Sequence, residues 1–129
     1  MNFNEKENFV EIQKVITRVS KLAKNSDLST DVLSARDCVN TKLFEKECEL
    51  KVFEFIRELE KLFSEGYCNY LELLNSFEIN VNTIEDIFDN EKGVLIMSED
   101  LNIRNNRLNF LSLIRNYSLK IADFTLLNF

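Results

Sequence analysis

Carboxylates are the only side chains of this sequence that are numerous enough to build a catalytic site. The chain has 22 Asp and Glu residues but no histidine, so the commonest general base and the commonest zinc ligand are both missing. Magnesium-dependent enzymes can work from helical carboxylates alone, and Glu54, Glu58, Glu85, Asp86 and Asp89 offer such a set. Charges that recur every few positions on a helix are, however, ordinarily a solvated face. We therefore expect no enzyme activity, no catalytic residue and no bound metal.

The cysteines and glycines also lack the spacing of a cofactor site. Cys38, Cys48 and Cys68 are ten and twenty residues apart, whereas a structural zinc site needs closely paired ligands. Such an odd number of cysteines predicts free thiols in a reducing compartment. Gly66 and Gly93 each follow a predicted helix, so no glycine-rich phosphate loop can form. We expect no cofactor.

One segment, residues 65–91, carries charge of a single sign. It holds seven acidic residues and no Lys or Arg, while the remaining 15 acidic residues are matched by all 16 basic ones. Repulsion between nearby carboxylates is mildly destabilising, so packing gives no reason for this clustering. Two tyrosines belong to the segment, and tyrosine is a residue type that anchors interfaces. The pattern predicts a binding surface for a basic protein partner, made of Glu65, Tyr67, Tyr70, Glu72, Glu78, Glu85, Asp86, Asp89 and Glu91.

A second interpretation of the same segment is internal neutralisation. The stretch between Leu101 and Ala122 has no acidic residue, and it contains Arg104, Arg107, Arg115 and Lys120. If these basic side chains face residues 65–91, the two charges cancel within the chain. The sequence leaves both interpretations open.

The periodicity of apolar residues supplies the elements that would position these groups. Intervals of three and four residues recur over most of the chain, which predicts amphipathic helices. The strongest pattern is 42–65, with Phe55 and Leu59 in the core. Further helices are predicted over 4–25, 32–38, 67–74 and 83–93.

Two short stretches instead suggest strands. Residues 77–81 alternate apolar and polar side chains, and 94–97 is a short aliphatic run. Residues 101–129 begin with a helical stripe and end with alternation around Tyr117, so helix and strand both remain open there. The predicted fold class is mainly α, a compact domain of about five or six helices, with the option of a minor two-stranded β element at residues 77–81 and 94–97.

Length and composition predict one domain over residues 1–129, since this is an ordinary domain size. The aliphatic run at 94–97 is far shorter than the ~20 residues of a membrane-crossing helix. Residues 1–8 lack the basic and apolar regions of a secretory signal, so we expect a cytoplasmic location. A net charge of −6 opposes general binding to nucleic acid or to anionic lipid.

Small size, absent catalytic groups and the acidic segment together resemble the profile of bacterial immunity proteins and antitoxins, which cover the active sites of basic nuclease toxins. The resemblance implies a monomeric, non-enzymatic inhibitor whose carboxylates stand in for nucleic acid phosphates, with no direct contact to nucleic acid or membrane. The alternative is a structural or adaptor subunit of a larger protein assembly. Such a subunit would bury an apolar helix face, or the apolar residues 124–129, against its partner.

Overall fold

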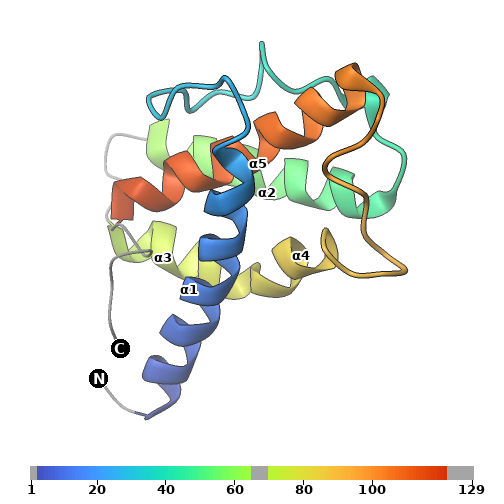
Figure 1. Ribbon diagram of the computed structural model, residues 1–129. Helices are drawn as coiled ribbons and strands as arrows, with labels where there is room; N and C mark the ends of the chain where they lie inside the picture. The colour runs from blue at the N-terminus through green and yellow to red at the C-terminus, as the bar shows by residue number, and fades with distance from the viewer. Residues whose placement is uncertain (1–2, 65–69, 122–129) are drawn as a thin grey trace.

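The computed structural model describes residues 3–64 and 70–121, with side chains from residue 9 onwards. Its elements are α1 (Phe3–Ala23), the 3-10 turn η1 (Thr41–Leu43), α2 (Glu47–Ser64), α3 (Tyr70–Ile79), α4 (Val81–Asp86) and α5 (Leu101–Ile121) (Figure 1). The mainly α fold class is confirmed. The two-stranded element is wrong, because the described residues contain no strand.

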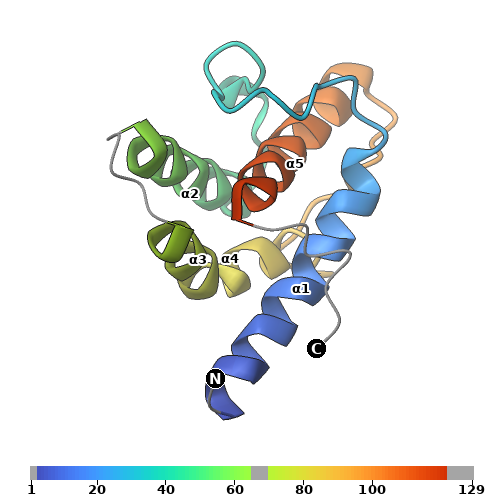
Figure 2. The same ribbon diagram turned by 90° about the vertical axis from the view of Figure 1, so that its left-hand side faces the viewer.

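Helix α5 is the centre of the fold. It contacts α1, α2, α3 and η1, and Figure 2 shows it between α2 and α1, above the pair formed by α3 and α4. From Asn106 to Ser118 all of its residues are buried except Asn109 and Arg115, which are half-buried. Within the described part of the chain, no helix combines the length and the apolar character that crossing a membrane requires.

The core forms around α5, and α2 contributes to it by packing on α3 and α5. Phe55 and Leu59 of α2 are 2% and 0% exposed, which confirms their predicted burial. The Phe55 ring lies edge-on to Phe77 of α3, with centroids 5.2 Å apart. Full burial of a side chain of this size contributes roughly 1.5–3 kcal/mol, so the α2 face is a main source of stability.

The short helix predicted over 32–38 is wrong. Residues 24–40 run across one end of the bundle as turns and irregular chain. The apolar spacing is present, and Ala35 is buried, but the carbonyls of this segment are bonded to side chains of α5 instead of to a helix of their own. Long-range hydrogen bonds have overridden local propensity here.

The strand predictions fail for identifiable local reasons. Residues 77–81 span the end of α3 and the start of α4, where Asn80 donates both its backbone N–H and its side-chain amide to the Ser76 carbonyl. Residues 94–97 lie in an irregular connection in which Val94 donates to the Ile87 carbonyl. The helix predicted over 83–93 is shorter and earlier than expected, because α4 covers Val81–Asp86.

Helix α5 settles the ambiguity of the last third of the chain as far as Ile121. It starts after Asp100, whose carboxylate accepts from the backbone N–H groups of Asn102 and Ile103 at 2.9 and 3.2 Å. This is an ordinary N-cap arrangement for an Asp. Just before the cap, the Ser98 hydroxyl accepts from the backbone N–H of Asp100 at 3.3 Å.

Candidate functional site at the amino-terminal half of α5

A surface pocket of about 570 Å³ lies between residues 36–43 and the first half of α5. The two walls come from distant parts of the sequence and are brought together by packing of α5 against η1. Side chains that bear amides and charges dominate the lining. It consists of Arg36, Asp37, Cys38, Val39, Asn40, Thr41, Lys42, Leu43, Asn102, Asn105, Asn106 and Asn109.

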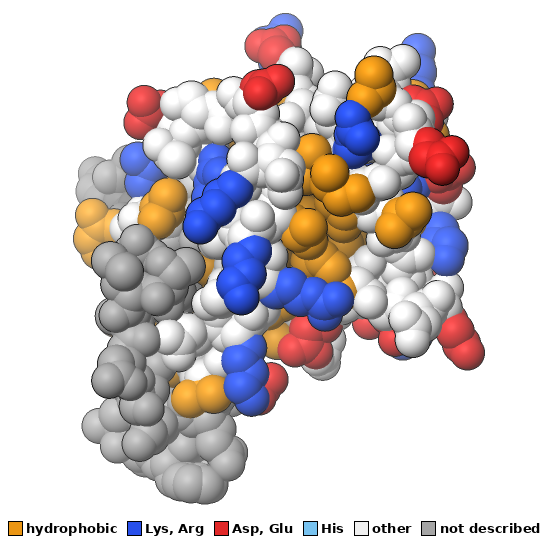
Figure 3. All heavy atoms as spheres, in the orientation of Figure 1, with side chains coloured by type: hydrophobic (Ala, Val, Ile, Leu, Met, Phe, Trp, Pro, Cys, Tyr) orange, Lys and Arg blue, Asp and Glu red, His pale blue; other side chains and the backbone are white. Residues whose placement is uncertain are grey.

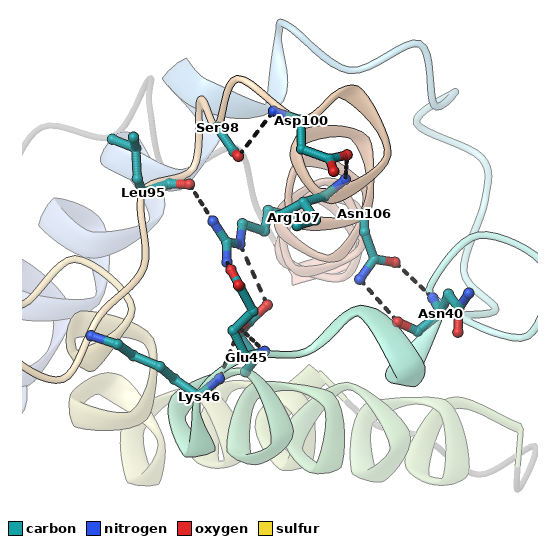
Figure 4. Close-up of polar contacts among 10 residues, drawn as sticks. Asn40, Glu45, Lys46, Leu95, Ser98, Asp100, Asn106 and Arg107 are labelled. Carbon is teal, nitrogen blue, oxygen red and sulfur yellow. Dashed lines mark hydrogen bonds and ion pairs between the residues drawn. The ribbon is translucent and has the colours of Figure 1, made fainter.

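Two asparagines join the walls. The side-chain N–H of Asn106 donates to the backbone carbonyl of Asn40 at 3.0 Å. The side-chain oxygen of Asn106 accepts from the backbone N–H of Asn40 at 2.6 Å. Figure 4 shows this reciprocal pair, with Asn106 pointing from α5 toward Asn40. The side chain of Asn40 in turn accepts from the Lys42 N–H at 3.0 Å and caps η1. The pocket is therefore held by hydrogen bonds at its base.

The same face of α5 holds the remainder of the 24–40 segment. Asn109 donates to the Cys38 carbonyl at 2.8 Å and accepts from the Ser26 hydroxyl at 3.1 Å. Further along, Asn116 donates to the carbonyls of Ser29 and Val32, Tyr117 to that of Leu33, and Arg115 to those of Ala23 and Leu28. These bonds satisfy backbone carbonyls that no helix or strand would otherwise pair.

Six side chains at the pocket are available to a ligand. Arg36, Asp37, Thr41, Lys42, Asn102 and Asn105 line it and are exposed. Within residues 3–64 and 70–121 none of their side chains forms a hydrogen bond or an ion pair. Together they offer two cations, one carboxylate, one hydroxyl and two amides, and this net positive set suits an anionic ligand with polar edges.

A buried ion pair lies beside this site. The guanidinium of Arg107 donates to the Leu95 carbonyl at 2.7 Å and contacts the Glu45 carboxylate (Figure 4). Its Nε lies 3.5 Å from Glu49 Oε2. The other oxygen of Glu49 accepts from the backbone N–H groups of Glu45 and Lys46 at the start of α2. Arg107 therefore ties α5 to α2 and to the chain around Leu95.

The described cysteines and carboxylates do not form a reactive or metal-binding centre. Burial raises the pKa of the Cys38 thiol, with a further contribution from the Glu60 carboxylate, and burial likewise raises the pKa of the Cys48 thiol. Both are free thiols, and a raised pKa disfavours the nucleophilic thiolate. No group of three potential metal ligands occurs among the described residues. Cys68 lies outside them.

The predicted acidic surface is spread over α3, α4 and the turn that follows. Glu65 and Tyr67 lie outside the described residues, and the other members are Tyr70, Glu72 and Glu78 on α3, Glu85 and Asp86 on α4, and Asp89 and Glu91 beyond it. All of these are exposed except Asp86, which is half-buried.

Two members of this acidic set have local structural roles. The Asp89 carboxylate accepts from the backbone N–H groups of Lys92 and Glu91 at 2.8 and 2.9 Å, and these bonds lower the pKa of its carboxyl group. Asp86 lies 3.9 Å from the Lys92 ammonium. Arg107 and Arg115 of α5 do not neutralise the acidic residues of 65–91. Arg107 pairs with Glu45 and Glu49, and Arg115 donates to backbone carbonyls.

Comparison with known proteins finds similarity to glycine–tRNA ligase beta subunits. The chain is 34% identical over 116 residues to the glycine–tRNA ligase beta subunit of Gloeothece citriformis, and 31% identical over 115 residues to that of Acaryochloris marina, in both cases over 88% of this chain. The beta subunit of Pseudoalteromonas atlantica is 32% identical over 83% of the chain. The chain spans only about 16% of the length of the first two relatives. No family model and no solved structure matches it.

These relatives overturn the functional expectations drawn from charge. Proteins named as subunits of a tRNA ligase are parts of an enzyme, so the expectation of a non-enzymatic immunity protein or antitoxin is wrong. The expected basic toxin partner and the expected absence of nucleic acid binding are contradicted by the same names.

Sequence reasoning missed the pocket, although the sequence holds a signal for it. Asn102, Asn105, Asn106 and Asn109 recur at the three- and four-residue spacing of one helix face. Because amides are uncharged and usually exposed, they contribute nothing to a search for charge or for an apolar stripe.

Proposed function

We propose that this chain is a component of a glycine–tRNA ligase of the beta-subunit type, and that it serves the enzyme by binding tRNA. The observation that carries the proposal is the extent of the similarity, which covers 88% of this chain in relatives that all bear that name. The earlier alternative of a subunit in a larger assembly agrees with it. Because the chain spans only about 16% of that relative's length, the proposal assigns the other functions of the ligase to other parts of the enzyme.

A row of basic side chains along α1 supports contact with RNA. Lys14, Arg18 and Lys21 follow one another at helical spacing, with Lys24 one turn beyond, and all four are exposed. At 1.5 Å per residue the row is about 15 Å long. Figure 3 shows Lys and Arg side chains following α1 down this face of the molecule. A linear array of cations suits a phosphodiester backbone.

The distribution of acidic residues removes the objection based on net charge. The net charge of −6 is concentrated in residues 65–91, whose described members lie on α3, α4 and the following turn. Part of α1 does meet this region, since Glu85 and Asp89 line a small pocket together with Lys14 and Arg18. Lys21 and Lys24 do not line that pocket, and phosphate contacts are expected to be strongest around them.

Exposed apolar side chains support membership of an assembly. Leu95, Met97 and Leu101 are 70%, 43% and 57% exposed within seven residues of chain. Figure 3 shows hydrophobic side chains gathered between α1 and the chain that leads into α5. Clusters of exposed apolar side chains mark protein interfaces more often than free surface.

Titration of the full chain against a fluorescein-labelled glycine tRNA transcript tests the proposal. We expect binding that weakens as salt rises, because each phosphate contact releases counterions. Lys21→Glu combined with Lys24→Glu should weaken binding by about tenfold or more through lost and repulsive phosphate contacts. The matched control is Lys51→Glu with Lys61→Glu on α2, which should bind as the natural chain does. Absence of tRNA binding at low salt would refute the proposed function.

A further inference from the structure

We propose that the pocket between residues 36–43 and α5 binds one unpaired nucleotide of RNA. In this arrangement the amides of Asn102 and Asn105 contact the edge of the base, and Arg36 and Lys42 contact the neighbouring phosphates. The inference rests on the proposed function, since the RNA is the tRNA of the ligase. It adds the place where a base is recognised and the residues that recognise it.

The size and lining of the pocket match this ligand. Its volume of about 570 Å³ lies within the ~300–1,000 Å³ typical of small-ligand sites. Five asparagines line it together with Arg36, Lys42 and a single carboxylate, Asp37. Such a lining offers hydrogen bonds and a net positive charge, whereas an apolar peptide would leave these groups unpaired.

The two free amides are placed to act together. Asn102 and Asn105 are three residues apart on α5 and therefore lie on one face of the helix. Each side-chain amide carries donors and an acceptor, which is the combination needed for the edge of a base. Bases of unpaired RNA present these edges, whereas paired bases hide them from side chains in a deep and narrow groove.

The wall beneath these amides is already fixed. Both hydrogen-bonding ends of Asn106 are engaged by the backbone of Asn40, and both ends of Asn109 are engaged by Cys38 and Ser26. The backbone at Lys42 is held by the Asn40 side chain. A pocket whose supporting groups are bonded before the ligand arrives loses less entropy on binding.

Binding of the labelled glycine tRNA transcript to variants of the full chain tests the inference. Asn102→Ala with Asn105→Ala should weaken binding about tenfold, because a base contact discriminates by an amount of this order. The salt dependence should stay unchanged in this variant. Lys42→Ala should lower the slope of log affinity against log salt by about 0.7, as expected for one phosphate contact with a single strand. The matched controls are Asn75→Ala with Asn82→Ala on α3 and α4, and Lys51→Ala on α2, all of them exposed positions.

Competition by an unlabelled RNA strand and by the same strand in a duplex supplies a second measurement. We expect the single strand to displace the tRNA from the natural chain, and the duplex to do so at least tenfold less well. If the asparagine variant binds like its control, or if the duplex competes equally, this inference is wrong while the proposed function stands. If the natural chain binds no tRNA, the proposed function fails, and this inference fails with it.

Discussion

At the scale of single residues, Arg107 is a charge held in a buried position. Its side chain is 5% exposed and meets Glu49, whose side chain is fully buried. Burying two charges has a large desolvation cost, which their attraction offsets only when the geometry is good and the remaining groups are hydrogen-bonded. One oxygen of Glu49 meets that condition through the backbone N–H groups of Glu45 and Lys46, whereas its Oε2 faces Arg107 Nε at 3.5 Å and neither of these two atoms has a hydrogen bond in the described chain.

Replacement of Arg107 by Met should lower the free energy of unfolding by about 3–5 kcal/mol, because it leaves the Glu49 carboxylate buried without its counter-charge. Urea denaturation followed by circular dichroism measures the change. Arg57→Met is the matched control, since Arg57 pairs with Glu60 at 3.4 Å but is 60% exposed. An exposed pair of this kind contributes about 0–1 kcal/mol. Equal losses in the two variants would show that the buried pair has no special role.

At the scale of elements, the 24–40 segment depends on α5. Asn116 is fully buried, and its amide donates to the carbonyls of Ser29 and Val32 at 2.9 and 2.7 Å. Tyr117 adds a bond of 2.7 Å to the Leu33 carbonyl. An irregular segment keeps one conformation when its backbone polar groups are satisfied in this way.

Asn116→Leu should therefore destabilise the protein by about 1–3 kcal/mol, since the Val32 carbonyl loses its donor and the Ser29 carbonyl keeps only the backbone N–H of Val32. Limited proteolysis should also cut residues 24–40 faster than in the natural chain. The exposed Asn75→Leu on α3 provides the comparison, with an expected change within about 0.5 kcal/mol. Unchanged unfolding and unchanged cleavage would mean that these bonds do not hold the segment.

The sequence predicted correctly those helices whose apolar and polar residues alternate with a helical period within one short stretch of chain. Residues 4–25 and 42–65 correspond to α1 and α2 because each has one buried and one solvated face, which produces the helical period. Helix α5 was ambiguous for the opposite reason. Its residues 106–118 are buried on nearly every side, polar ones included, so no contrast between faces remains to be read.

The remaining failures come from partners that are distant in sequence. The bonds that prevent a helix over 32–38 come from residues 84 to 87 positions away. The walls of the candidate site are likewise joined by Asn40 and Asn106, which are 66 positions apart. No pattern within a short window carries this information.

At the scale of the whole molecule, the net charge predicted no binding to nucleic acid, whereas the distribution of charge over the surface favours it. Acidic residues of 65–91 share a small pocket with Lys14 and Arg18 of the basic row but not with Lys21 and Lys24, so a chain with net charge −6 still presents a cationic surface around these two lysines. Because salt screens charges over a Debye length of about 8 Å, the attraction of an RNA phosphate depends more on the nearby surface charges than on the net charge of the chain.

Assembly with the ligase should depend on the apolar side chains before α5. We expect Leu95→Ser with Met97→Ser to reduce co-purification of this chain with a co-expressed glycine–tRNA ligase from the same organism, because contact area is lost at the interface. Leu71→Ser with Ile79→Ser alters two side chains on α3 that are at least as exposed as Leu95 and Met97, and it should leave co-purification intact. If only the α3 variant loses co-purification, the interface lies on α3. If the natural chain does not co-purify with the ligase, the proposed interface does not exist.

The bonds from α5 to residues 23–40 also set an order of events during synthesis. Arg115 reaches the Ala23 carbonyl across 92 positions, and Asn106 reaches Asn40 across 66. A ribosome adds about 5–20 residues per second, so residues 23–40 wait for several seconds before their partners are made. Throughout that interval their carbonyls can bond only to water or to N–H groups near them in the sequence, such as the Val32 N–H on the Ser29 carbonyl. The wall of the pocket is thus among the first parts to be translated and among the last to take its final shape.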